Sequence, residues 1–195
     1  MMKIKPDQML GSKIGFFVMM TLGAQAAFAA LPQWQMVPEK SSITFIATQN
    51  DAPVKGEFKK FNADIQFDPA QLKDSHANIT IDTSSINTSY QELAEALKMS
   101  EWFDVKTFPQ ASFKSKDFTK VGDNTYEAKG DITIRDKTIP ASIKFTVENS
   151  TPSQLQTKGT TTLKRTAFGI GQGEWSDTKE VKDDVKVDFT LDLKQ

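Results

Sequence analysis

The sequence predicts an all-β domain, built either as an antiparallel β-sandwich or as a closed antiparallel β-barrel of about eight strands. Apolar and polar residues alternate through many short stretches, most regularly through 185–193, where every second residue is Val, Phe or Leu. A period of two places one face of a strand against an apolar interior and the other in water. Short polar turns at 122–124, 135–137 and 149–153 separate these stretches, as is typical of both architectures.

Strand signals follow one another along the whole domain. The first is 43–48, and the second, 54–68, is predicted to be one long strand or a bent pair with Gly56 as a bulge or a bend. Asp68-Pro69 ends it as a turn. Further strands are predicted within 78–86, 109–118, 125–138, 139–149, 155–168 and 185–193. Because no internal repeat or long linker interrupts the series, a single domain is predicted.

One segment has helical rather than strand periodicity. Residues 89–92, Ser-Tyr-Gln-Glu, have the S-x-x-E form of a helical capping box. Leu93, Ala94 and Leu97 then fall at helical spacing, so a short helix of about ten residues is predicted, followed by an aromatic turn at Trp102. Such an insert commonly covers one end of a barrel or lies over one sheet. Its apolar stripe serves either as packing or as a gate.

Composition excludes several kinds of chemistry. A net charge of −1 argues against nucleic acid as the main partner, because domains that bind phosphates are usually basic. The chain has no cysteine and one histidine, His76. It therefore cannot build a thiolate nucleophile, a disulfide, an iron–sulfur cluster or a Cys/His zinc site. A Ser-His-Asp relay would have to use His76, which lies in a polar turn and is predicted to be a surface residue.

Residues 1–29 are predicted to be a signal peptide, which leaves 30–195 as the mature domain. Three lysines precede an uncharged apolar stretch at 14–28, and 27–29, Ala-Phe-Ala, fit the small-x-small pattern of a cleavage site. The alternative is an uncleaved membrane anchor, although the apolar stretch is short for a membrane span. Export is therefore expected, most simply to a bacterial periplasm.

Two polar motifs favour plain structural roles. The glycine-rich run 169–173 lacks the following helix that a phosphate loop needs, so it is interpreted as a tight bend in which glycine accepts positive φ. Asp177, Glu180, Asp183 and Asp184 carry ligands for a hard cation such as Ca²⁺, but their spacing matches no EF-hand and a solvated turn is favoured. We therefore expect no metal site, no cofactor and no enzymatic activity.

The aromatic residues are the strongest signal for the interior. The chain has fourteen phenylalanines and three tryptophans. Inward strand positions are occupied by Phe45, Phe58, Phe67, Phe113, Phe145, Phe168 and Phe189. A filled β core explains all of them. A barrel of about eight strands, however, is just wide enough either to fill with side chains or to hold one small ligand, and periodicity does not separate the two.

A series of short motifs runs through nearly the whole mature chain, from about Trp34 to Leu193. They are 41–45 (SSITF), 56–58 (GEF), 67–69 (FDP), 79–88 (ITIDTSSINT), 102–104 (WFD), 108–115 (FPQASFKS), 130–134 (GDITI), 163–171 (LKRTAFGIG) and 174–175 (EW). This ordered set resembles the YceI-like family of lipid- and polyisoprenoid-binding proteins. Two positions depart from the family: 48–50 (TQN) stand where many members have a histidine, and 91–92 (QE) where many have an Arg-Asp pair.

The resemblance implies a lipocalin-like antiparallel β-barrel in an exported or periplasmic setting, without a catalytic residue shared by the family. It also implies a long apolar ligand in the barrel, such as a polyisoprenoid, a prenyl quinone or a fatty-acid-like lipid. The residues expected to line the ligand site are Phe45, Phe67, Ile79, Ile81, Leu93, Leu97, Trp102, Phe103, Phe113, Ile132, Ile134, Phe145, Phe168 and Trp175.

Two other functions stay open at this stage. A ligand-free barrel that docks to a membrane or periplasmic partner would expose Trp34, Trp102 or Trp175 in a surface patch. A hydrolase has less support, because no nucleophile–base pair is visible. The expected partners are an apolar lipid and, transiently, a membrane or membrane protein, and the chain is expected to be a monomer or a homodimer.

Overall fold

The computed structural model describes residues 31–195. Within them most of the regular structure is β-strand, with one short α-helix, so the predicted all-β fold with one helical insert is confirmed. The predicted signal peptide, 1–29, lies outside the described residues and stays a prediction. None of the helices found within 31–195 has the length and apolar character needed to cross a membrane.

Most strands follow one another through short connections, and the two longest connections are 98–109 and 165–183. The strands are β1 Gln33–Met36, β2 Ser42–Gln49, β3 Ala52–Phe58, β4 Phe61–Gln66, β5 His76–Asp82, β6 Ile86–Thr88, β7 Gln110–Lys120, β8 Thr125–Ile134, β9 Lys137–Thr151, β10 Gln154–Lys164 and β11 Asp184–Lys194. The α-helix is α1 Gln91–Leu97, and the 3₁₀ helices are η1 Pro38–Lys40, η2 Thr83–Ser85, η3 Thr166–Phe168 and η4 Gly173–Ser176.

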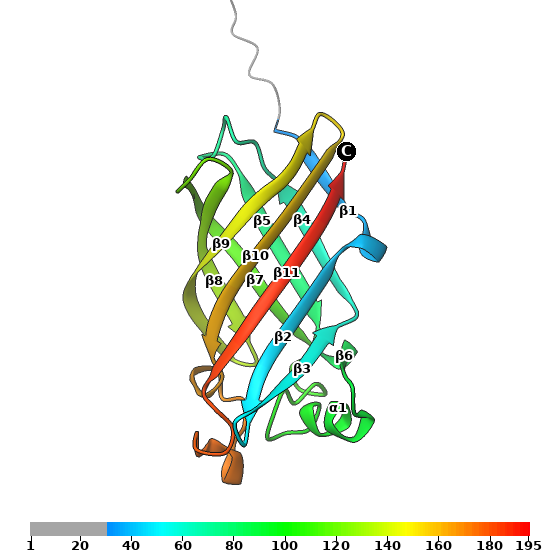
Figure 1. Ribbon diagram of the computed structural model, residues 1–195, viewed down its shortest axis with the longest axis vertical. Helices are drawn as coiled ribbons and strands as arrows, with labels where there is room; N and C mark the ends of the chain where they lie inside the picture. The colour runs from blue at the N-terminus through cyan, green and yellow to red at the C-terminus, as the bar shows by residue number, and fades with distance from the viewer. Residues whose placement is uncertain (1–30) are drawn as a thin grey trace, which may run out of the picture. The chain divides into compact units, whose positions relative to one another are not determined.

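Eight strands close into an antiparallel barrel, which decides between the barrel and the sandwich (Figure 1). The ring runs β1-β4-β5-β7-β8-β9-β10-β11 and closes where β11 pairs again with β1, with Lys194 opposite Gln35. Beyond η1, β2 takes the place of β1 beside β11, and β3 and β6 continue the sheet from β2. Because the sheet closes on itself, each ring strand has a partner on both sides and its inward side chains share one interior.

The second predicted strand is a bent pair, β3 and β4, but Gly56 is neither a bulge nor the bend. The two strands are separated at Lys59 and Lys60. Gly56 instead pairs with Phe45 within an unbroken ladder between β2 and β3. The prediction at Gly56 is therefore wrong. The absence of a side chain at Gly56 leaves room for the Phe45 ring, and the strand does not bend there.

The α-helix is shorter than predicted and lacks the capping box. It begins after Tyr90, and no side chain accepts a hydrogen bond from its first turn. The Tyr90 amide instead donates to Thr88 Oγ1 at 3.2 Å. Ala94 and Leu97 are its buried residues. Figure 1 shows α1 at one end of the barrel, near β3 and β6.

The two ends of the barrel are built differently. The aromatic end is filled by Trp34, Phe67, Phe118, Tyr126 and Phe145, all of them buried. The centroid of the Phe67 ring lies 5.6 Å from the ring centroid of Phe118, 5.3 Å from that of Tyr126 and 5.7 Å from that of Phe145. The opposite end, here called the helix end, is covered by α1, the turn 98–109 and the loop 165–183.

Candidate functional site: an apolar cavity inside the barrel

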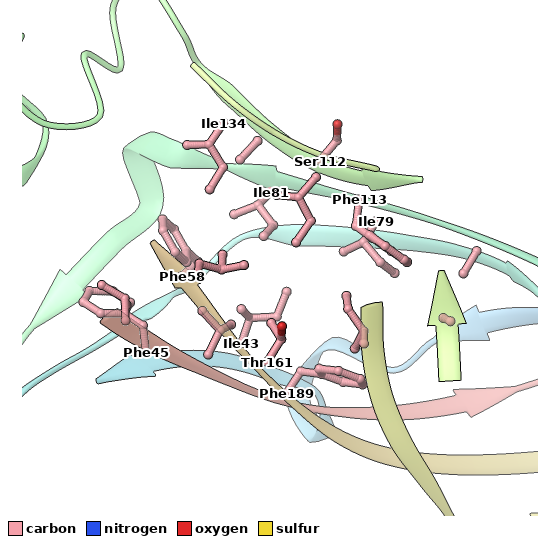
Figure 2. Close-up of a pocket in the computed structure, with 18 of the residues that line it drawn as sticks. Ile43, Phe45, Phe58, Ile79, Ile81, Ser112, Phe113, Ile134, Thr161 and Phe189 are labelled. Carbon is pink, nitrogen blue, oxygen red and sulfur yellow. The ribbon is translucent and has the colours of Figure 1, made fainter. Parts of the chain in front are cut away.

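A cavity of about 240 Å³ lies inside the barrel, between the aromatic end and the helix end. One water molecule needs only about 10–15 Å³ on the same measure, so the space is far larger than a packing defect. Figure 2 shows Ile79, Ile81 and Phe113 on one wall, facing Ile43 and Phe189 on the other. Of the two interiors that periodicity left open, filled or hollow, the structure has the hollow one.

Strand alternation directs one row of side chains from each wall strand into this cavity. In β11, every second residue from Val185 to Leu193 lines the cavity. Between them, Lys186 and Asp188 pair at 2.9 Å on the opposite face. The apolar residues of the alternating pattern in the sequence are therefore the residues of β11 that line the cavity.

The wall presents almost no polar group. The polar residues that line it are Ser112, Thr157, Thr161 and Arg165, and the others are alanine, valine, isoleucine, leucine, phenylalanine and tryptophan. Across residues 31–195, no three or more His, Cys, Asp or Glu side chains gather where they could hold a metal ion. Such a wall suits an apolar ligand, whose affinity comes from removal of its surface from water.

Arg165 lies at the helix end of the cavity and is 3% exposed. Its five N–H groups donate to five main-chain carbonyls of the loop 165–183. These bonds run from Nε to Lys182 at 3.2 Å, from Nη1 to Ile170 at 2.9 Å and Gly171 at 3.4 Å, and from Nη2 to Asp177 at 3.2 Å and Val181 at 2.8 Å. Burial lowers the pKa of the guanidinium, and the charge of Asp183 opposes that shift. Because every donor is used, Arg165 fixes the loop and leaves no N–H for a ligand.

Three consecutive main-chain carbonyls of the turn 98–109 accept hydrogen bonds that hold the turn at the helix end. Arg135 Nη1, from the β8–β9 turn, donates to the Ser100 carbonyl at 2.8 Å and also to that of Trp102. The amides of Gly171 and Gln172 both donate to the Glu101 carbonyl at 2.8 Å. These bonds place Trp102 and Phe103 against the cavity.

The structure places twelve of the fourteen predicted ligand-site residues on the cavity wall. They are Phe45, Phe67, Ile79, Ile81, Leu97, Trp102, Phe103, Phe113, Ile132, Ile134, Phe145 and Phe168. Whether these side chains touch a ligand stays a prediction.

Leu93 and Trp175 are not part of the wall. Of α1, only its last residue, Leu97, reaches the cavity, and Leu93 packs against the buried cluster to which Leu97 belongs. The Trp175 ring lies 5.7 Å from that of Trp102, and of the two only Trp102 lines the cavity. Sequence spacing alone did not distinguish the first layer of side chains from the second.

Other residues also line the cavity, although the predicted set does not include them. Small ones such as Ala47, Ala111 and Ala128 lie at inward positions and set its width, and strict alternation along each strand would have found them. Arg165 is also part of the wall. Nothing in its local sequence signals a buried charge, apart from the family motif in which it lies.

Comparison with known proteins agrees with this architecture. The model of the YceI-like domain matches residues 34–193. A UPF0312 protein of Vibrio cholerae is 30% identical over 122 residues, which is 60% of this chain and 65% of that protein. A UPF0312 protein of Pseudomonas putida is 31% identical over 134 residues, which is 66% of this chain and 70% of that protein. The chain thus spans just under two thirds of the length of the Vibrio cholerae relatives that it matches.

Solved structures share the fold. Burkholderia cenocepacia BcnA superposes with a TM-score of 0.77 at 34% identity and covers 80% of this chain and 98% of its own. A YCEI protein of Campylobacter jejuni gives 0.68 at 22% identity, with 74% of this chain and 86% of its own covered. A polyisoprenoid binding domain from Saccharophagus degradans has a TM-score of 0.66 at 12% sequence identity. The match covers 85% of this chain and 99% of that domain. The predicted lipocalin-like barrel is thereby confirmed, and since the domain model matches nearly all of the described residues, this chain belongs to the YceI-like family.

Proposed function

We propose that this protein binds one long apolar chain, a polyisoprenoid, a prenyl quinone or a fatty-acid-like lipid, inside its barrel in the periplasm. The observation that carries the proposal is the cavity of about 240 Å³ with its nearly all-apolar wall. Burial of apolar surface contributes about 25 cal/mol per Å², so a long chain gains affinity along its whole length without specific polar contacts. Association costs then reduce the net affinity.

Two further observations support this proposal over the alternatives. One structural relative is described as a polyisoprenoid binding domain. A ligand-free docking module would expose tryptophan, but Trp34 is buried and Trp102 and Trp175 are each partly buried. We further propose that the ligand is bound and released unchanged, since the wall has no pair of groups that could transfer a proton.

The experiment is to fill the cavity with one substitution. Thr161 lies on the wall in Figure 2, and none of the side-chain hydrogen bonds found within 31–195 involves it. Thr161→Trp therefore adds a large apolar group inside without breaking a buried bond. Thr162 is the next residue on β10, is exposed and points outward, so Thr162→Trp is the matched control.

The measurement is native mass spectrometry of protein exported in bacteria, followed by organic extraction and lipid identification. Wild type and Thr162→Trp should co-purify with an apolar lipid or take up an added prenyl quinone, and Thr161→Trp should do neither while remaining folded by circular dichroism. If wild type holds no lipid and takes none up, or if the two tryptophan variants retain lipid equally, the proposal is wrong.

The proposed location has its own test. A tagged full-length chain should be recovered from the periplasmic fraction with Ala30 as its first residue, because 27–29 fit a cleavage site. Recovery of the uncleaved chain in the membrane fraction would support the anchor instead.

A further inference from the structure

Three glycines face the interior of the barrel, and a phenylalanine ring from a neighbouring strand covers each of them. A Cβ atom built on Gly56 would lie 2.2 Å from Phe45 Cζ, one on Gly159 2.3 Å from Phe189 Cζ, and one on Gly130 2.8 Å from Phe113 Cε2. Phe45, Phe113 and Phe189 all line the cavity. Each ring thus occupies the volume that a side chain on the adjacent strand would otherwise fill.

The strand register explains why the rings lie along the wall. Phe45 stands directly opposite Gly56 between β2 and β3, and Phe189 directly opposite Gly159 between β10 and β11. Residues that stand opposite one another in an antiparallel pair project to the same face, here the interior. With no side chain on the glycine, each ring can lie over the neighbouring strand rather than extend across the cavity. The glycines therefore keep the interior wide where a phenylalanine is present.

Gly56 differs from the other two glycines in what an added methyl group would meet. At Gly130 the methyl would collide with the Lys114 carbonyl oxygen at 2.2 Å, and at Gly159 with the Lys144 carbonyl oxygen at 2.7 Å. Moving those atoms would shift the backbone. At Gly56 the three nearest atoms all belong to the Phe45 ring. This ring can move by rotating its side chain, so the backbone need not move.

The position of Phe45 decides which part of the cavity would change. Its ring lies 5.8 Å from that of Phe58, which in turn lies 5.6 Å from the ring of Phe103 in the turn 98–109. Phe45 also belongs to one buried cluster with Leu97 of α1. A ring lifted from the wall here would narrow the cavity at its helix end and leave the part beside the aromatic end unchanged.

We propose that Gly56 is a specificity-determining residue, which sets the longest apolar chain that the cavity accepts by letting the end of the Phe45 ring lie over β3. This inference rests on the proposed binding of an apolar chain. It assigns the length limit to one cross-strand pair at the helix end rather than to the cavity as a whole.

The test compares prenyl alcohols of increasing length, farnesol, geranylgeraniol and solanesol, as competitors of an environment-sensitive naphthylamine probe on delipidated protein. Gly56→Ala should bind farnesol as wild type does and lose roughly tenfold or more in affinity for solanesol, as expected when an apolar pocket becomes too small. Gly56→Ala combined with Phe45→Leu should recover solanesol binding, because the ring that the methyl displaces is gone. Gly122→Ala, in the exposed turn between β7 and β8, is the control for a general glycine-to-alanine effect.

A loss that is equal for all three alcohols, or no recovery in the double variant, overturns the inference. A crystal structure of unliganded Gly56→Ala gives a second readout, in which the Phe45 ring must have left β3. If Gly56→Ala does not fold, Phe45→Leu alone should not lower the affinity for solanesol relative to that for farnesol, and a loss confined to solanesol overturns the inference. If wild-type protein binds none of the alcohols or the probe, the proposed function fails. The position of the Phe45 ring in the Gly56→Ala crystal structure then decides whether Gly56 keeps the cavity wide.

Discussion

The aromatic end and the helix end of the barrel are closed by different kinds of interaction. At the aromatic end, Phe67 packs against three other rings and is 3% exposed. At the helix end, hydrogen bonds to main-chain carbonyls hold the cover in place, and Arg135 and Arg165 supply many of the donors. Packed rings stabilise through many small contacts, whereas a hydrogen bond is lost over a short displacement. We therefore expect the aromatic end to carry stability and the helix end to open first.

The two arginines of the helix end also differ from each other. Arg165 uses all five donors within the loop 165–183. Arg135 holds the turn 98–109 through one nitrogen, lies 5.3 Å from the centre of the Phe108 ring, and has a buried Nε without a hydrogen-bond partner. A buried donor left unpaired is unfavourable. Arg135 thus holds the turn 98–109 through fewer donors than Arg165 uses for the loop 165–183, so we expect the turn to be the more readily displaced part of the cover.

The largest expected effect is at the aromatic end. Phe67→Ala removes a buried ring from the centre of the cluster and should lower the free energy of unfolding by about 3–5 kcal/mol. Urea denaturation followed by tryptophan fluorescence measures it. Phe103→Ala at the helix end is the comparison, and its loss should be smaller because Phe103 is only partly buried. Equal losses at the two positions would contradict the assignment of stability to the aromatic end.

The next effect is at Arg165. Arg165→Met leaves five carbonyls of the loop 165–183 without their donor. It should cost about 1.5–3 kcal/mol, the value of one hydrogen bond to a charged group, because the cost of burying the guanidinium charge is removed at the same time. Hydrogen exchange should increase at the amides of 166–183 and stay unchanged in β7 and β8. Arg165→Lys should restore only part of the protection, because an ammonium has three donors. Unchanged exchange within the loop would show that Arg165 does not fix it.

A kinetic effect is expected at Arg135. Arg135→Asn removes the bonds to the Ser100 and Trp102 carbonyls, and asparagine accepts the φ of +55° that this position has. Bound lipid should transfer to acceptor vesicles roughly tenfold faster, as expected for the loss of about 1.4 kcal/mol, with little change in equilibrium stability. Lys137→Asn, an exposed position at the start of β9 directly after the same turn, is the control. An unchanged transfer rate would place lipid release elsewhere.

The smallest effect is the pH dependence at Asp183. Burial favours the neutral acid, but hydrogen bonds from the Thr166 amide and hydroxyl and the charges of Lys164 and Arg165 outweigh it, so the pKa lies below the ordinary 3.8. In the unfolded chain Asp183 protonates first as pH falls, so its contribution to stability is present above about 3.8 and is lost below it. Asp183→Asn should be less stable than wild type at neutral pH, and this difference should shrink as the pH of the urea titration falls. A difference that does not depend on pH would remove the electrostatic explanation.

Most of the fold and of the candidate wall could be predicted from local pattern. The inward row of β11 follows from the period of two, and seven of the twelve predicted wall residues lie on strands that keep their alternation across the cavity. The capping box at 89–92 and the bulge at Gly56 were wrong for the same reason. In both places a local motif was taken to decide the backbone, whereas neighbouring strands and the turn before α1 decided it.

The sequence by itself determined which side chains face inward, since alternation is a property of each strand alone. It also determined that the interior is apolar and that the chain belongs to the YceI-like family. Only the tertiary structure decided that the interior is hollow. That depends on the number of strands that close the ring and on where each ring side chain lies, as with Phe45 over Gly56. Both are relations between residues of different strands, and periodicity within one strand carries no information about them.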